Sequence, residues 1–228
     1  MKAATALLIA ALLSLVASWL CYRATGPTLG LFFGPILLAT FLVPPLVLAH
    51  KESPLAQALT VAGVVLGVLP VWLYAALLIY PEDQPHATPG DVVRCLPVLA
   101  AYALALAGIA AALSRVPSMP AALASFVTMV LGTAWLTWPV WLSPWLPGKD
   151  WVVAALGPLN PLLAVNAALK HMGLWDEQRL AYRLTALVRD VTYAPPAGVR
   201  WSVLFHTLVG AALSLIYVFG GTLRRRSA

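Results

Sequence analysis

Residues 143–200 read SPWLPGKDWVVAALGPLNPLLAVNAALKHMGLWDEQRLAYRLTALVRDVTYAPPAGVR and form the one long interruption between two apolar segments of the chain. Within this stretch, two short apolar blocks are separated by a Gly-Pro breaker at 157–158. Asn160 followed by Pro161 predicts a helix start, because Asn caps free N–H groups and proline fits the first turn. A helix from there to His171 spans about 18 Å at ~1.5 Å per residue, too short for a hydrocarbon core of ~30 Å. We therefore expect it to dip into a membrane and return, or to lie in the interface.

A further helix is predicted later in the same stretch, over 175–193. Leucines and valines recur there at helical spacing, while most of the arginines fall off that face. Such an amphipathic helix is suited to lie on a membrane surface or against neighbouring spans.

The composition indicates that the solvent of this chain is lipid. Of its 228 residues, 61% are hydrophobic and 10% are charged, whereas about 25% charged residues is usual in soluble domains. We expect one polytopic membrane domain over 1–228. The net charge of +6 does not indicate nucleic-acid binding, because the cations stand at the ends of apolar segments and form no basic stripe with interleaved aromatics.

Six apolar segments are long enough to cross a bilayer, and they predict an all-α integral membrane protein with two short outer re-entrant or interfacial helices and an amphipathic helix between spans five and six. The predicted spans are 3–22, 28–49, 54–80, 92–114, 120–142 and 201–223. The first could instead be a signal peptide. A retained span is favoured, because the apolar run exceeds the usual ~7–15 residues and no clean cleavage site follows it.

The distribution of cations predicts the orientation. Six spans place both termini on one side, and the short segments of that side hold Lys2, Lys51, Arg115 and Arg224–Arg226. Only two cations, at positions 23 and 94, occupy the opposite short loops. The positive-inside rule then predicts a multi-pass protein of the cell (inner) membrane with both termini in the cytoplasm.

The two cysteines fall near the same predicted face. Cys21 ends the first span and Cys95 begins the fourth, so both are expected at the outer side. An oxidising compartment would permit a disulfide between them, and the alternative is a pair of separate apolar cysteines.

Little in the sequence indicates catalysis. No Asp or Glu lies inside the predicted spans, and His206 is the only ionisable side chain well within one, as a functional group or a hydrogen-bonded packing residue. The acidic loop around His86 lacks the converging spacing of a metal site. Serine-hydrolase, zinc-protease and phosphate-loop motifs are absent from the sequence. We expect no enzyme activity, cofactor or metal in this chain.

Two passages carry a resemblance to a known family. They are LAAYALALAGIAAALSRVPSMPAALASFVTMVLGTAWLTWPVWL at 99–142 and LGPLNPLLAVNAAL at 156–169. A small-residue span, a short turn with Arg, a span ending near Pro and an Asn-Pro-Leu before a short helix resemble, in this order, the permease subunits of type-2 ATP-binding-cassette exporters.

The resemblance implies a separate cytosolic ATP-binding subunit and a homo- or heterodimer with another membrane subunit. It implies an outer gate built from the two short helices, with Trp151, Asn160, Pro161, Asn166 and His171. It also implies turns that face the ATPase, at His50, Lys51, Glu52 and Arg115.

Two departures from that family concern the coupling to an ATPase. Only Met1 and Lys2 precede the first span, where family members carry a cytosolic helix, and the segment between spans two and three is only 50–54. The leading hypothesis is a permease-like subunit that exports or flips an unknown, amphiphilic substrate. The alternative is a non-transporting scaffold or assembly subunit of a larger membrane complex.

Overall fold

The computed structural model describes residues 2–26, 29–50, 53–78, 86–169 and 198–226. Every regular element in these ranges is a helix, which confirms the predicted all-α class. The predicted amphipathic helix at 175–193 lies outside the described residues, as do Lys51, Glu52 and His171.

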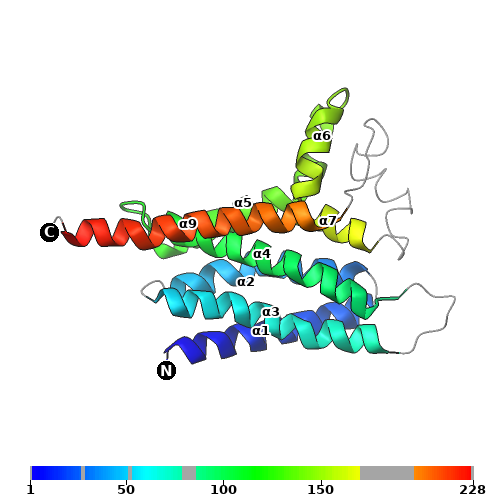
Figure 1. Ribbon diagram of the computed structural model, residues 1–228, viewed down its shortest axis with the longest axis horizontal. Coiled ribbons are helices and arrows are strands. Elements are labelled where there is room, and N and C mark those ends of the chain that lie inside the picture. Colours follow the sequence, from blue (N-terminus) through cyan, green and yellow to red (C-terminus); the bar gives the residue numbers. More distant parts are fainter. Residues whose placement is uncertain (1, 27–28, 51–52, 79–85, 170–197, 227–228) are drawn as a thin grey trace.

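Six of the described helices are long and apolar enough to cross a membrane, which indicates a multi-pass membrane protein. They are α1 (Lys2–Thr25), α2 (Leu29–Ala49), α3 (Pro54–Leu77), α4 (Pro89–Leu113), α5 (Ala121–Trp141) and α9 (Arg200–Arg226). They run side by side in one bundle with both termini at the same end, and the turns after α2 and α4 lie at that end too (Figure 1).

The fourth helix starts earlier than the sequence predicted. Thr88 caps α4 and exchanges hydrogen bonds with Asp91, which in turn accepts from the Thr88 backbone N–H at 2.9 Å. This reciprocal capping satisfies two of the N–H groups that a helix start leaves free. The expectation that no acidic residue lies within a span is therefore wrong for this turn, because Asp91 is part of the helix and only 1% exposed.

Helix α1 buries its smallest side chains and exposes its largest. Ala6, Ala10, Ser14 and Ser18 follow one another at intervals of four and are all buried, whereas the leucines, isoleucine and valine between them are mostly exposed. In water this arrangement would be unfavourable, because the large apolar side chains would stay exposed to solvent. In lipid it is favourable, because small residues let helices approach closely while large apolar ones meet the acyl chains.

Glycines allow close contacts between two pairs of helices. A side chain at Gly67 of α3 would overlap the carbonyl oxygen of Ala11 on α1, and one at Gly63 would meet the same helix. Gly108 of α4 and Gly210 of α9 face each other in a similar way, since a Cβ at Gly108 would lie 2.8 Å from the Gly210 carbonyl oxygen. These glycines are needed because a Cβ in either place would force the backbones apart.

Proline also shapes α2. Pro35 has no N–H, so the Leu31 carbonyl one turn earlier loses its helical partner. The indole Nε1–H of Trp72, from α3, donates to that carbonyl at 2.9 Å. Trp72 is fully buried and its ring lies 4.8 Å from that of Phe32. A neighbouring helix therefore supplies the hydrogen bond that the proline removed.

Candidate functional site

The candidate site is the insertion between α5 and α9. A short turn of 3₁₀ helix, η1 (Ser143–Trp145), is followed by α6 (Asp150–Leu156), a second 3₁₀ turn η2 (Gly157–Leu159) and α7 (Pro161–Ala168). The helix axis turns by 79° between the α6–η2 segment and α7. Helix α6 stands away from the bundle, and α7 lies at the bundle end opposite the termini (Figure 1). The two short helices predicted from the sequence are thus present, and α7 ends three residues before the predicted His171.

Asn160 joins this insertion to α5. Its side-chain oxygen accepts from the backbone N–H groups of Leu162 and Leu163 at 2.9 and 3.1 Å, which caps α7. Its Nδ2 donates to the carbonyls of Trp135 and Leu136 at 2.8 and 3.2 Å. The side chain is completely buried. One amide therefore serves two helices at once.

The Trp135 carbonyl needs this outside donor for a specific reason. In a regular helix it would accept from the N–H of the residue four positions further along. That residue is Pro139, which lies inside α5 and has no N–H. Asn160 therefore replaces the missing helical hydrogen bond, as Trp72 does in α2.

The side chain of Trp135 extends the connection to α9. Its Nε1–H donates to Nε2 of His206 at 3.0 Å, so Nε2 acts as the acceptor and the imidazole proton lies on Nδ1. Nδ1 then donates to the Ser202 carbonyl at 2.7 Å. The ring of Trp135 also lies against Phe205. His206 is 3% exposed and has both nitrogens bonded, the arrangement of a packing residue.

A second polar contact lies one turn back along α5. Tyr102 of α4 donates its hydroxyl to the Gly132 carbonyl at 3.2 Å, and the hydroxyls of Tyr102 and Thr40 lie 3.0 Å apart. A Cβ at Gly132 would come within 3.0 Å of both side chains. The ring of Tyr102 meets that of His206 edge-on at 5.4 Å. Helices α2, α4, α5, α7 and α9 are thus joined through one buried polar centre.

The structure separates the predicted gate residues into two groups. Asn160, Pro161 and Asn166 are buried where α7 packs on the bundle, whereas Trp151 on α6 is 72% exposed. A small cluster holds α6 to α5, in which Val153 and Leu163 pack on Trp138.

The predicted ATPase-facing residues that the structure describes are both accessible. His50 is half-buried after α2, and Arg115 is exposed after α4 with its guanidinium 4.2 Å from the centre of the Tyr217 ring. Cys21 and Cys95 are both free thiols. Cys21 faces Gly34 of α2, and Cys95 is fully buried in the core of the bundle.

Sequence reasoning identified Asn160 and His206. It interpreted Trp135 chiefly as one of the tryptophans that anchor a span end at the interface, and it missed Tyr102, Thr40 and Gly132. One signal was present, because Pro139 inside a span predicts an unpaired carbonyl at Trp135. The identity of the donor was not in the local sequence, since Asn160 lies 25 positions away.

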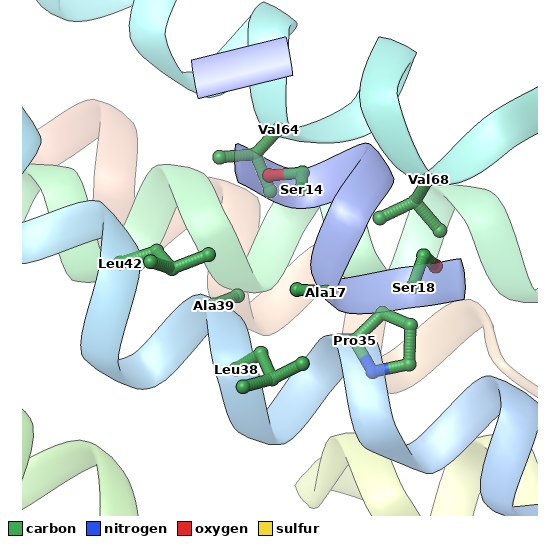
Figure 2. Close-up of a pocket in the computed structure, with 9 residues that line it drawn as sticks. All are labelled: Ser14, Ala17, Ser18, Pro35, Leu38, Ala39, Leu42, Val64 and Val68. Atoms are coloured by element: carbon green, nitrogen blue, oxygen red, sulfur yellow. The ribbon is translucent and has the colours of Figure 1, made fainter. Parts of the chain in front are cut away.

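Two other features of the described residues bear on a site, the distribution of metal-ligating side chains and a cavity. No group of His, Cys, Asp or Glu in that part of the chain could hold a metal ion. Figure 2 shows a cavity where Ser14, Ala17 and Ser18 of α1 face α2 and α3. Its volume is about 10 Å³, near the smallest space that holds one water molecule. It is therefore no substrate site.

No known family model, no curated protein and no solved structure matches this chain. The resemblance to exporter permeases therefore rests on the order and character of the segments themselves.

Proposed function

We propose that this chain is the membrane-spanning, permease-like subunit of an ABC-type exporter, with ATP hydrolysis supplied by a separate cytosolic subunit. The observation that carries the proposal is the insertion of two short helices, bent by 79°, between α5 and α9. It stands at the bundle end opposite the termini (Figure 1). We assign no catalytic role, cofactor or metal to the chain itself.

The proposed orientation places both termini in the cytoplasm and the insertion on the outer side of the inner membrane. The turn after α4 carries Arg115 at the termini's end, and α9 ends at that side in Arg224–Arg226. In the sequence, Lys51 lies between α2 and α3. The positive-inside rule favours this arrangement. Helices α6 and α7 then act as the outer gate, dipping into the membrane or lying at its interface.

The substrate pathway is proposed to run between two membrane subunits. The cavity between α1, α2 and α3 has a volume of about 10 Å³, which leaves no room for a cargo larger than water. An amphiphilic cargo fits spans whose exposed surfaces are large and apolar. A homo- or heterodimer of such subunits would enclose the pathway and place two α6 helices around its outer end.

The ATPase would contact the turns at the termini's end, with His50 and Arg115 as the described residues. Arg115 is suited to this because it is exposed while the ring of Tyr217 holds its guanidinium in place. An acidic surface on the ATPase would complement it.

The test is recovery of the full chain from native membranes in mild detergent, followed by mass spectrometry and an ATPase assay. We expect a stoichiometric nucleotide-binding subunit with turnover. Arg115→Glu should reduce its recovery about tenfold or more, because charge reversal at a close interfacial pair costs several kcal/mol. The matched control is Arg94→Glu, an exposed arginine at the opposite end of α4, which should leave recovery unchanged. Equal recovery with both variants would contradict the assigned face.

A non-transporting scaffold or assembly subunit is the second candidate. It is favoured by the short connection between α2 and α3, which comprises only residues 50–53 and leaves a small docking surface. In that case the same purification yields the chain alone or with other integral membrane proteins, and the eluate has no ATPase activity.

A further inference from the structure

We infer that Asn160 is a latch that holds the α6–α7 insertion against the proline break in α5. This role depends on Pro139, because Asn160 donates to the Trp135 carbonyl, which has no hydrogen-bond donor within α5. The inference concerns the position of the insertion, so it stands independently of any ATPase partner.

The first step concerns the Trp135 carbonyl, which would lose its hydrogen-bond donor if the insertion moved away from α5. Pro139 leaves the Trp135 carbonyl without its helical donor, and Asn160 Nδ2 fills the position at 2.8 Å. If Asn160 departs, the carbonyl is left unpaired beside Leu136 and Trp138, which are 2% and 1% exposed. An unpaired buried polar group is unfavourable, and water is scarce at membrane depth. The insertion therefore leaves α5 only if α5 itself rearranges at Pro139.

The second step is that packing alone holds α6 weakly. Val153 is the only fully buried side chain of α6, and it packs on Trp138. The indole N–H of Trp138 is itself buried without a hydrogen-bond partner in the described part of the chain. Such a group weakens the closed cluster. Helix α7 packs on the bundle through several buried side chains, and the hydrogen bonds of Asn160 add to that packing at the point where the insertion meets α5.

The third step links the latch to α9. Trp135 accepts a hydrogen bond from Asn160 through its backbone carbonyl, and its indole N–H donates to His206. A change of α5 at Pro139 moves Trp135, and with it the contact to α9. Opening of the insertion is in this way coupled to the last span.

The test is a double-mutant cycle between Asn160→Ser and Pro139→Ala. Serine still caps α7, because its hydroxyl accepts from N–H groups as asparagine does, but it is too short to reach α5 as well. Alanine at 139 restores an N–H for the Trp135 carbonyl, so Asn160 is no longer needed there. The reporter is Val153→Cys, in a background where Cys21 and Cys95 are alanine, and the readout is its rate of modification by a maleimide in lipid nanodiscs.

We expect Asn160→Ser to raise the modification rate about fivefold or more when Pro139 is present. In the Pro139→Ala background the same substitution should change the rate by less than about twofold. Equal effects in the two backgrounds would overturn the latch. The matched control is Asn166→Ser, the same truncation of a buried residue on the same helix, whose effect should be equal in both backgrounds.

A second variant keeps the inference testable if Asn160→Ser does not fold. Pro139→Ala alone weakens the latch, because the carbonyl now has a partner inside α5. It should raise the modification rate about twofold or more while the melting temperature stays equal or rises. An unchanged or slower rate would overturn the inference. A lost ATPase partner with an intact cycle would contradict the permease proposal only.

Discussion

The α1–α3 pair and the junction of α5, α7 and α9 solve the problem of helix association in different ways. Helices α1 and α3 meet through glycines, alanines and serines, and the hydroxyls of Ser14 and Ser18 are buried without a hydrogen-bond partner in the described part of the chain. At the junction, Asn160, Trp135 and His206 form directed hydrogen bonds across helices. The first contact depends on shape and the second on paired polar groups.

The difference indicates which of the two contacts is better suited to a change of conformation. A contact made by close packing weakens steeply with separation, because dispersion acts only at short range. A contact made by a few hydrogen bonds has discrete alternatives, because each donor can find another acceptor. We therefore expect the α1–α3 pair to act as a frame, and we propose the junction as the place where a gate would rearrange.

The largest expected effect tests the frame. Gly67→Leu would drive a side chain into the backbone of α1 at Ala11, so the two helices must separate. We expect a loss of about 3 kcal/mol or more in unfolding free energy, at the upper end of overpacking effects. The control is Leu66→Phe, which adds bulk at the neighbouring exposed position. Denaturant titration in bicelles measures both, and similar losses would show that the contact is not set by close packing.

An intermediate effect is expected where a side chain repairs a proline break within the bundle. Trp72→Phe removes the donor to the Leu31 carbonyl and leaves a small cavity, so we expect a loss of about 2–3 kcal/mol. Combined with Pro35→Ala, which restores the helical N–H, about 1 kcal/mol of that loss should return. If the loss is the same in both backgrounds, the indole acts by packing alone.

The smallest expected effect concerns the connection between α5 and α9. Trp135→Phe leaves Nε2 of His206 without its donor. Hydrogen bonds between membrane helices contribute about 0.6 kcal/mol on average, so we expect a loss of about 1 kcal/mol once the lost packing is included. Trp141→Phe is the control on the same helix, because its indole is half exposed and bonds only to α5 itself. It should cost less than about 0.5 kcal/mol.

The long helices could be predicted from the sequence because length and apolarity decide what crosses a bilayer. The prediction placed the start of the fourth span at 92, and the structure begins α4 at Pro89. The reason is the reciprocal capping of Thr88 and Asp91, which a hydropathy pattern does not register. The start of α7 at Pro161 agreed with the prediction, because the Asn-Pro signal acts within adjacent residues.

The sequence by itself determined an all-α chain with six apolar helices, and its prolines at 35 and 139 each remove the N–H that a helical carbonyl would need. Only the tertiary structure decided which donors fill those places, Trp72 from α3 and Asn160 from the insertion. The physical reason is the distance along the chain over which each effect acts. Apolarity and proline act along the chain within a few residues, whereas a hydrogen bond across helices depends on which helices pack together and at what rotation.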